Sequence, residues 1–232
     1  MSATPVTKFF CKAAGKRGEI YLYDGIGDDG YSGIGASAFA QAMAEMGKVD
    51  ALDLYINSPG GSVFEGLAIY NQITRFKGEK VAYIDGIAAS IASVIPLACE
   101  KRVIAGNGTF MIHDPYSIAL GSADDLRKAA SSLDKIRDTL LDTYVAKTGG
   151  DRKELSDLMA EETWFNADEA IQRGFATSKT EDKTFKAEFP MLAKFKHVPA
   201  ELRKQATASN LLQARMAMRT AHLNRRPAGA TA

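Results

Sequence analysis

Cysteine is scarce in this sequence, and long apolar runs are absent. Cys11 and Cys99 are the only cysteines among 232 residues. They are too few for a disulfide framework or a zinc cluster, and they favour a reduced compartment. The longest apolar stretch, residues 87–99, contains two serines and a proline, and it is shorter than the roughly 20 residues that span a bilayer. The N-terminal residues lack the features of a secretory signal. We therefore expect a soluble, cytoplasmic protein without membrane contact.

Net charge is also nearly absent, but charge is unevenly distributed. The formal net charge of +1 excludes a general attraction to nucleic acid or to an anionic membrane. From residue 183 onward, however, ten Lys/Arg residues face two acidic ones. We therefore predict one domain over residues 1–182, with residues 1–16 flexible, and a basic tail over residues 183–232. The tail is expected to be partly helical, over 201–223, and otherwise disordered. It is either a solvated or oligomer-contacting arm, or an arm that binds nucleic acid or an acidic scaffold.

Phosphate-binding signatures are missing as well, although a glycine-rich turn is present. The segment NSPGG at residues 57–61 follows an apolar run and precedes residues with helical spacing. It contains neither the Gly-Lys-Ser/Thr of a P-loop nor a G-x-G-x-x-G pattern. The same turn can present backbone N–H groups to another anion, the oxyanion that forms during acyl transfer. That interpretation requires a nucleophile and a base elsewhere in the chain.

Apolar spacing predicts strands that alternate with helices. We expect strands at residues 19–24, 51–57, 80–84, 101–105 and 109–112, and helices at 33–47, 62–76, 88–99 and 122–147. This alternation predicts an α/β fold with a mostly parallel sheet. The last helix begins after Ser122, ends before Gly149 and Gly150, and carries one apolar stripe: Leu126, Leu133, Ile136, Leu140, Tyr144 and Val145. Either a neighbouring subunit or the core of the same domain could cover that stripe.

Histidine is scarce too, and this narrows the search for a general base. His197 and His222 lie in the basic tail, which leaves His113, directly after the strand 109–112. The candidate nucleophile is Ser90, which we place at the start of helix 88–99 after a turn at residues 85–86. Ser93 lies one turn deeper and is expected to be buried. Taken alone, each residue also has a structural explanation: a strand-end histidine, or a small polar residue in an alanine-rich helix.

The glycine pair, Ser90 and His113 all follow strands, so one edge of the sheet would bring them together. Four blocks, YINSPGGSVFEGLAIYNQI, GIAASIASVIPLA, TFMIHDP and EETWFNADEAIQRGFAT, resemble the Clp-type serine peptidases (the ClpP proteolytic subunit, peptidase family S14) in order and approximate spacing. The resemblance covers residues 17–178. The Glu-Thr-Trp-Phe version of the fourth block is most similar to the ClpP-related head-maturation proteases of tailed phages. The resemblance implies a crotonase-like β-α superhelix with a protruding long helix and, here, a basic C-terminal tail.

The resemblance also implies roles for individual residues. Ser90 matches the family's nucleophile and His113 its general base, while the backbone N–H groups of Gly61 and Ile91 match the oxyanion hole. The backbone beside the glycines would pair with an extended peptide substrate, through these residues: Gly60, Ser62 and Val63.

The third member of the triad departs from the family's pattern. Trp164 aligns with the aromatic residue that opens the fourth block, which puts Glu162 in the place of the family's aspartate. Thr163 replaces the arginine that pairs ring to ring in the family, so the chain lacks the side chain that makes that pairing. Asp168 fits better in the first turn of a helix at residues 167–173.

These features predict a serine endopeptidase that assembles into a ring-like homo-oligomer and cleaves proteins or peptides, with capsid or scaffold proteins as phage substrates in the prohead or the host cytoplasm. The chemistry requires no metal or cofactor. Any unfolding activity would come from a separate ATPase, since the sequence lacks a P-loop. One alternative is a crotonase-like acyl-CoA hydratase or isomerase, a class that ordinarily uses carboxylates and needs no Ser-His pair. Another is a catalytically silent scaffold subunit of the same fold.

Overall fold

The computed structural model describes residues 9–27, 33–181 and 195–199. These residues contain an eight-stranded sheet in the order β1-β2-β3-β4-β5-β8, with β6 paired to β4 and β7 paired to β6. Pairing is parallel except at β1–β2 and β6–β7. The strands are β1 (Phe9–Ala14), β2 (Arg17–Leu22), β3 (Ala51–Ser58), β4 (Glu79–Ala89), β5 (Lys101–Ala105), β6 (Thr109–Ile112), β7 (Thr163–Phe165) and β8 (Ser178–Thr180). The predicted α/β fold with a mostly parallel sheet is confirmed.

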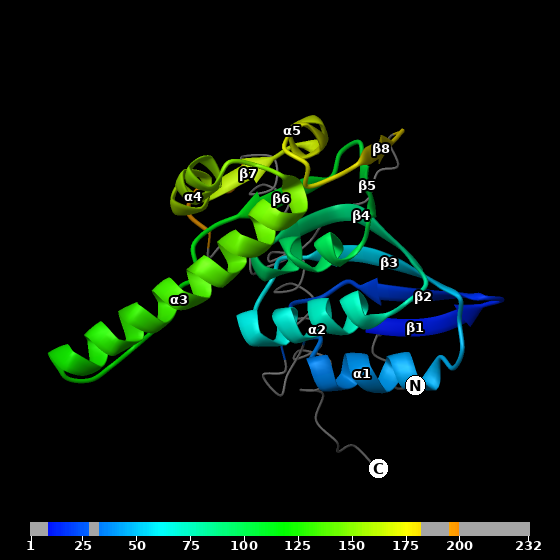
Figure 1. Ribbon diagram of the computed structural model, residues 1–232, viewed down its shortest axis with the longest axis horizontal. Helices are drawn as coiled ribbons and strands as arrows, with labels where there is room; N and C mark the ends of the chain where they lie inside the picture. The colour runs from blue at the N-terminus through cyan, green and yellow to red at the C-terminus, as the bar shows by residue number, and fades with distance from the viewer. Residues whose placement is uncertain (1–8, 28–32, 182–194, 200–232) are drawn as a thin grey trace, which may run out of the picture. The chain divides into compact units, whose positions relative to one another are not determined.

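Helices α1 and α2 lie along the same side of the sheet (Figure 1). The helices are α1 (Ala36–Glu45), α2 (Val63–Arg75), α3 (Ala123–Thr148), α4 (Arg152–Ala160) and α5 (Ala167–Gln172), with short 3₁₀ turns η1 (Ser90–Ser93) and η2 (Ile95–Ala98). The core consists mainly of aliphatic side chains from β2, β3, β4 and α2 that are fully buried: Ile20, Leu22, Leu54, Ile56, Ile69, Ile73 and Ile84. Strand β3 is buried along nearly its whole length, as expected of a central strand covered on both faces, whereas buried residues alternate along β2.

Strand β4 is the element that positions the site. It pairs with β3 on one side; on its other side it pairs first with β5, through residues 81–84, and then with β6, through residues 87–89. The predicted turn at residues 85–86 and the predicted helix at 88–99 are therefore wrong. Sheet pairing with β6 overrides the helical spacing of the apolar residues, and two short 3₁₀ turns follow in place of one helix.

Several segments differ from the predicted pattern at the chain's periphery. Strand β1 pairs with β2 within the stretch for which we expected flexibility. The short strands β7 and β8 and the helix α4 were not predicted, because segments of this length carry little periodicity. The predicted boundary at residues 182–183 and the predicted helix at 201–223 lie outside the described residues, so both stay predictions.

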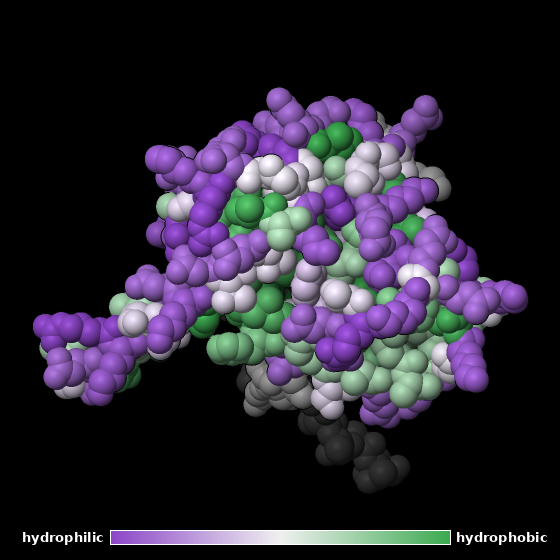
Figure 2. Space-filling view, in the orientation of Figure 1, coloured by the Kyte–Doolittle hydropathy of each residue, from purple (hydrophilic) through white to green (hydrophobic). Residues whose placement is uncertain are grey.

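Helix α3 begins and ends as its sequence predicts. Ser122 and Asp125 form a reciprocal capping box, and Gly149 ends the helix with φ 74°. The C-terminal half packs on the core through Leu140, Leu141 and Tyr144, whereas Leu126 in the first turn is 46% exposed. The N-terminal half extends away from the sheet (Figure 1), and hydrophilic residues cover most of that part (Figure 2). The core of the same domain therefore covers only the C-terminal half of the apolar stripe.

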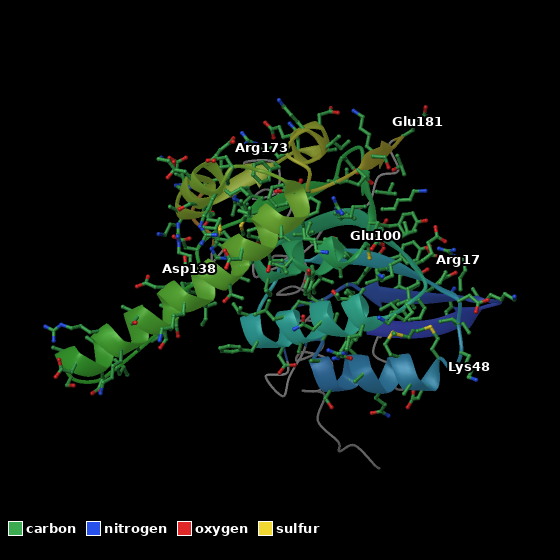
Figure 3. All side chains as sticks on the ribbon, viewed as in Figure 1. Arg17, Lys48, Glu100, Asp138, Arg173 and Glu181 are labelled. Carbon is green, nitrogen blue, oxygen red and sulfur yellow. The ribbon has the colours of Figure 1, made fainter. Side chains whose placement is uncertain are left out.

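Ion pairs join neighbouring helices and neighbouring strands. Arg152 at the start of α4 pairs with Asp138 and Asp142 of α3, and Figure 3 labels Asp138 midway along that helix. At the other end of the sheet, Arg17 of β2 pairs with Asp53 of β3 at 2.6 Å and with Glu79 of β4 at 2.7 Å. Among the residues that the structure describes, no helix is long and apolar enough to cross a membrane.

Candidate active site

Ser90 lies on a strained turn at the end of β4. Its φ is 55°, in the left-handed region, and Glu162 has φ 52°. Within the described part of the chain these are the non-glycine residues with positive φ. Such a conformation costs about 1–2 kcal/mol for an L-residue, and strain of this kind is concentrated at functional sites. The two strained residues are the serine and the glutamate that the resemblance assigns to a catalytic triad.

His113 lies beside Ser90 because of the pairing between β4 and β6. Ala89 is paired with Met111 in the parallel ladder, so the residues that follow both strands emerge at the same edge. The Ser90 Oγ and His113 Nε2 atoms are 2.8 Å apart, which is hydrogen-bond distance. The His113 ring also faces Tyr116, with ring centroids 5.8 Å apart. The structure thus brings together the two residues predicted as nucleophile and base.

The glycine turn packs directly against Ser90. Gly60 has φ 89°, and a Cβ at this position would lie 2.6 Å from both the Ala89 carbonyl oxygen and the Ser90 Cβ. Gly61 has φ 151°, and a Cβ there would lie 2.0 Å from the Ile26 carbonyl oxygen. Only glycine fits either position without displacing the backbone. This close approach is the structural reason for the two glycines.

The backbone amides of Gly61 and Ile91 were predicted to bind an oxyanion. Ile26 donates to the Gly60 carbonyl and accepts from the Ser62 amide, so Gly61, paired with Ile26 as an isolated bridge, directs its own N–H away from that strand. Ile91 is in the first turn of η1, where amides have no partner within the helix. Among the described residues neither amide donates to a backbone carbonyl in the turns and loops.

Glu162 directly precedes β7, which pairs antiparallel with β6. The ladder pairs Met111 with Trp164 and Ile112 with Thr163, so the next residues in this register are His113 and Glu162. The Glu162 residue is 8% exposed, and its Oε1 accepts a hydrogen bond of 3.3 Å from Trp164 Nε1. Glu162 and His113 therefore both lie directly beyond the end of this ladder, and the Glu162 carboxylate contacts Trp164.

Asp168 and the predicted substrate residues occupy other surroundings. Asp168 lies in the first turn of α5 and pairs with Lys179 at 2.7 Å. Ser62 is the N-cap residue of α2 but its side chain makes no capping bond; it is exposed and Val63 is half-buried. Phe64 beside them is 70% exposed. The backbone after the glycines thus remains accessible on the protein surface.

Sequence reasoning missed the side chains that hold the site from behind. Ser93 Oγ donates to the Ser90 carbonyl at 2.6 Å and lies 2.7 Å from the hydroxyl of Tyr144. Ser93 is fully buried, as predicted. Burial raises the pKa of Tyr144 far above its ordinary value, so this phenol stays protonated.

Arg137 of α3 pairs with Asp114, the neighbour of His113, at 2.6 Å. No group of metal-ligating side chains occurs in the described residues.

The fold and the site define an α/β protein with a serine-histidine pair at the edge of a largely parallel sheet. The family model described as Clp protease matches residues 10–182. The chain belongs to the Clp protease family.

Relatives with known names agree with this assignment. The chain is 36% identical over 125 residues to ATP-dependent Clp protease proteolytic subunit 3 of Rhodococcus jostii, covering 52% of this chain. It is 30% identical over 159 residues, 67% of this chain, to subunit 1 of Protochlamydia amoebophila. It is 33% identical over 123 residues, 51% of this chain, to subunit 1 of Chlamydia muridarum. The matches span 61%, 76% and 64% of these relatives' own lengths, in that order.

Proposed function

We propose that this chain is a serine-type endopeptidase that hydrolyses peptide bonds of protein substrates. The observation that carries the proposal is the 2.8 Å contact between Ser90 Oγ and His113 Nε2. A serine within hydrogen-bond distance of a histidine can lose its proton as it attacks a carbonyl carbon. Membership of the Clp protease family supports the same reaction. A crotonase-like hydratase or isomerase would not require this pair.

The proposed reaction uses each group at a defined step. Ser90 Oγ attacks the scissile carbonyl, and its proton moves to His113 Nε2. The tetrahedral oxyanion accepts hydrogen bonds from the N–H groups of Gly61 and Ile91. His113 then gives the proton to the leaving amine as the C–N bond breaks. Water, deprotonated by His113, hydrolyses the remaining ester and restores Ser90.

Glu162 is proposed to orient His113 through the second ring nitrogen. Its support is the β6–β7 register, its 8% exposure and its strained backbone. A buried carboxylate in this place selects the productive tautomer and stabilises the imidazolium that forms during attack. Asp168 is the weaker candidate, because its carboxylate pairs with Lys179 on an exposed surface.

The substrate is proposed to bind as an added strand along the backbone from Gly60 to Val63. Extended peptides bind to accessible strand edges through main-chain hydrogen bonds. The exposure of Gly61 and Ser62 supports this position. Since main-chain bonding is independent of sequence, this segment contributes affinity rather than selectivity.

The chain is further proposed to act in a ring-like homo-oligomer. The supporting observation is the projecting half of α3, with its exposed Leu126. The relatives are named proteolytic subunits of ATP-dependent proteases, so a separate ATPase is a proposed partner. The Glu-Thr-Trp-Phe block supports a role in phage head maturation, with capsid or scaffold proteins as substrates.

Four variants test the proposed chemistry by turnover of a fluorogenic peptide and by native mass. Ser90→Ala should lose about 10³-fold or more in turnover while it assembles normally. Glu162→Gln should lose up to about 10⁴-fold, and Glu162→Asp should retain part of the activity because the charge remains. Asp168→Asn is the control and should lose only about 0.3–1 kcal/mol of helix stabilisation. An active Glu162→Gln beside an inactive, folded Asp168→Asn would reverse the assignment, and an inactive wild type that assembles would indicate a silent scaffold subunit.

A further inference from the structure

The carbonyl of Ser90 is held by a chain of two buried hydroxyl groups. Ser93 Oγ lies 2.6 Å from the Ser90 carbonyl oxygen and 2.7 Å from the Tyr144 hydroxyl. A carbonyl can only accept, so the single hydroxyl hydrogen of Ser93 is used there, and Tyr144 must donate to Ser93. The exposed fractions of Ser93 and Tyr144 are 0% and 2%. Water therefore does not compete for these bonds.

The peptide that this chain holds also carries a proposed oxyanion-hole donor. The Ser90 C=O and the Ile91 N–H belong to the same peptide unit, which is planar, and in a trans peptide the two bonds point in opposite directions. A hydrogen bond that fixes the direction of the Ser90 carbonyl therefore fixes the direction of the Ile91 N–H. Hydrogen bonds in series also polarise one another, which strengthens the donor at the far end.

We propose that Ser93 and Tyr144 are positioning residues, which hold the strained Ser90–Ile91 peptide so that the Ile91 N–H points at the oxyanion. The inference rests on the proposed peptidase function, and it adds that helix α3, through Tyr144, controls the geometry of the oxyanion hole. Neither hydroxyl touches the substrate. The left-handed φ of Ser90 explains why such support is needed, because an unsupported residue would relax toward negative φ.

Three variants test the inference, with a matched control. Tyr144→Phe removes only the hydroxyl, Ser93→Ala removes the bond to the carbonyl, and the third variant combines both. Tyr83→Phe is the control, because it makes the same change in a ring stacked on Tyr55, in the part of β4 that precedes the site. Turnover, KM and thermal midpoint are measured for each.

We expect Tyr144→Phe and Ser93→Ala each to lower kcat by at least about tenfold. This loss should be smaller than the 10²–10³-fold loss that removal of an oxyanion donor causes. KM should not change, because the oxyanion exists only in the transition state. The double variant should be no worse than Ser93→Ala, since both act through one peptide. Wild-type kcat in both single variants, additive losses, or a rise in KM alone would overturn the inference.

Hydrogen exchange separates this inference from the proposed function. The Val94 amide donates to the Ile91 carbonyl at 3.1 Å, within the turn that the two hydroxyls hold. Its exchange should be faster in Tyr144→Phe than in the wild type or in Tyr83→Phe, whether or not the chain cleaves peptides. Unchanged exchange would contradict the positioning role. An inactive wild type with faster exchange in Tyr144→Phe would contradict only the peptidase function.

Discussion

Replacement of Gly60 by alanine perturbs the site at its closest backbone contact. A Cβ at position 60 would lie 2.6 Å from the Ala89 oxygen and from the Ser90 Cβ, whereas ordinary contact begins at 3.4 Å. The backbone must therefore separate by close to one ångström. Displacement of this size in an active site can cost about 10²-fold in rate. The left-handed φ of residue 60 adds about 1–2 kcal/mol of conformational cost.

Gly47→Ala separates these two effects. Gly47 has φ 74°, and a Cβ there would meet nothing within 4 Å, so this variant bears the conformational cost alone. Urea denaturation should show a loss of about 1–2 kcal/mol for Gly47→Ala and at least as much for Gly60→Ala. Peptide turnover should fall about 10²-fold in Gly60→Ala only. Equal turnover in the two variants would refute the claim that Gly60 sets the position of the backbone against Ser90.

Two further predictions concern stability and assembly. Burial raises the pKa of Cys99 from 9.0 to about 12, so its contribution to stability is full below about pH 9 and is lost as the pH rises toward 12. The urea midpoints at pH 8 and pH 10.5 should therefore differ less in Cys99→Ala than in the wild type. An equal difference in the two proteins would show that the thiol does not cause the loss of stability. Leu126→Glu should yield smaller species by light scattering that remain folded by circular dichroism, because Leu126 is 46% exposed. Leu140→Glu should lose several kcal/mol of unfolding free energy, because it buries a charge. An unchanged mass in Leu126→Glu would remove the end of α3 from the interface.

The parallel sheet and the position of His113 directly after a strand could be predicted from the sequence because they depend on local signals. Apolar runs that end in glycine or histidine mark strand ends, and parallel strand ends meet at one edge. Residues 88–99 were misassigned because apolar residues in a short segment fit a helix and a buried strand equally well. The pairing of Ala89 with Met111 decided the outcome, and it depends on residues far apart in the chain.

The support behind the site could not be predicted for a related reason. Ser93 and Tyr144 are 51 positions apart, and each resembles an ordinary buried residue in its own segment. The left-handed conformation of Ser90 carries no sequence signal, since serine is rare at positive φ. Glu162 was found through alignment of Trp164 with the family's pattern, and the antiparallel register of β6 and β7 supplies its physical basis.

The proposed mechanism requires His113 to activate Ser90 as a nucleophile. Its most direct test is reaction of the full chain with a fluorophosphonate, followed by peptide mapping by mass spectrometry. We expect modification at Ser90 alone, no modification of the buried Ser93, and loss of labelling in His113→Ala with the native mass of the assembly retained. Labelling at another serine, or equal labelling in His113→Ala, would contradict it.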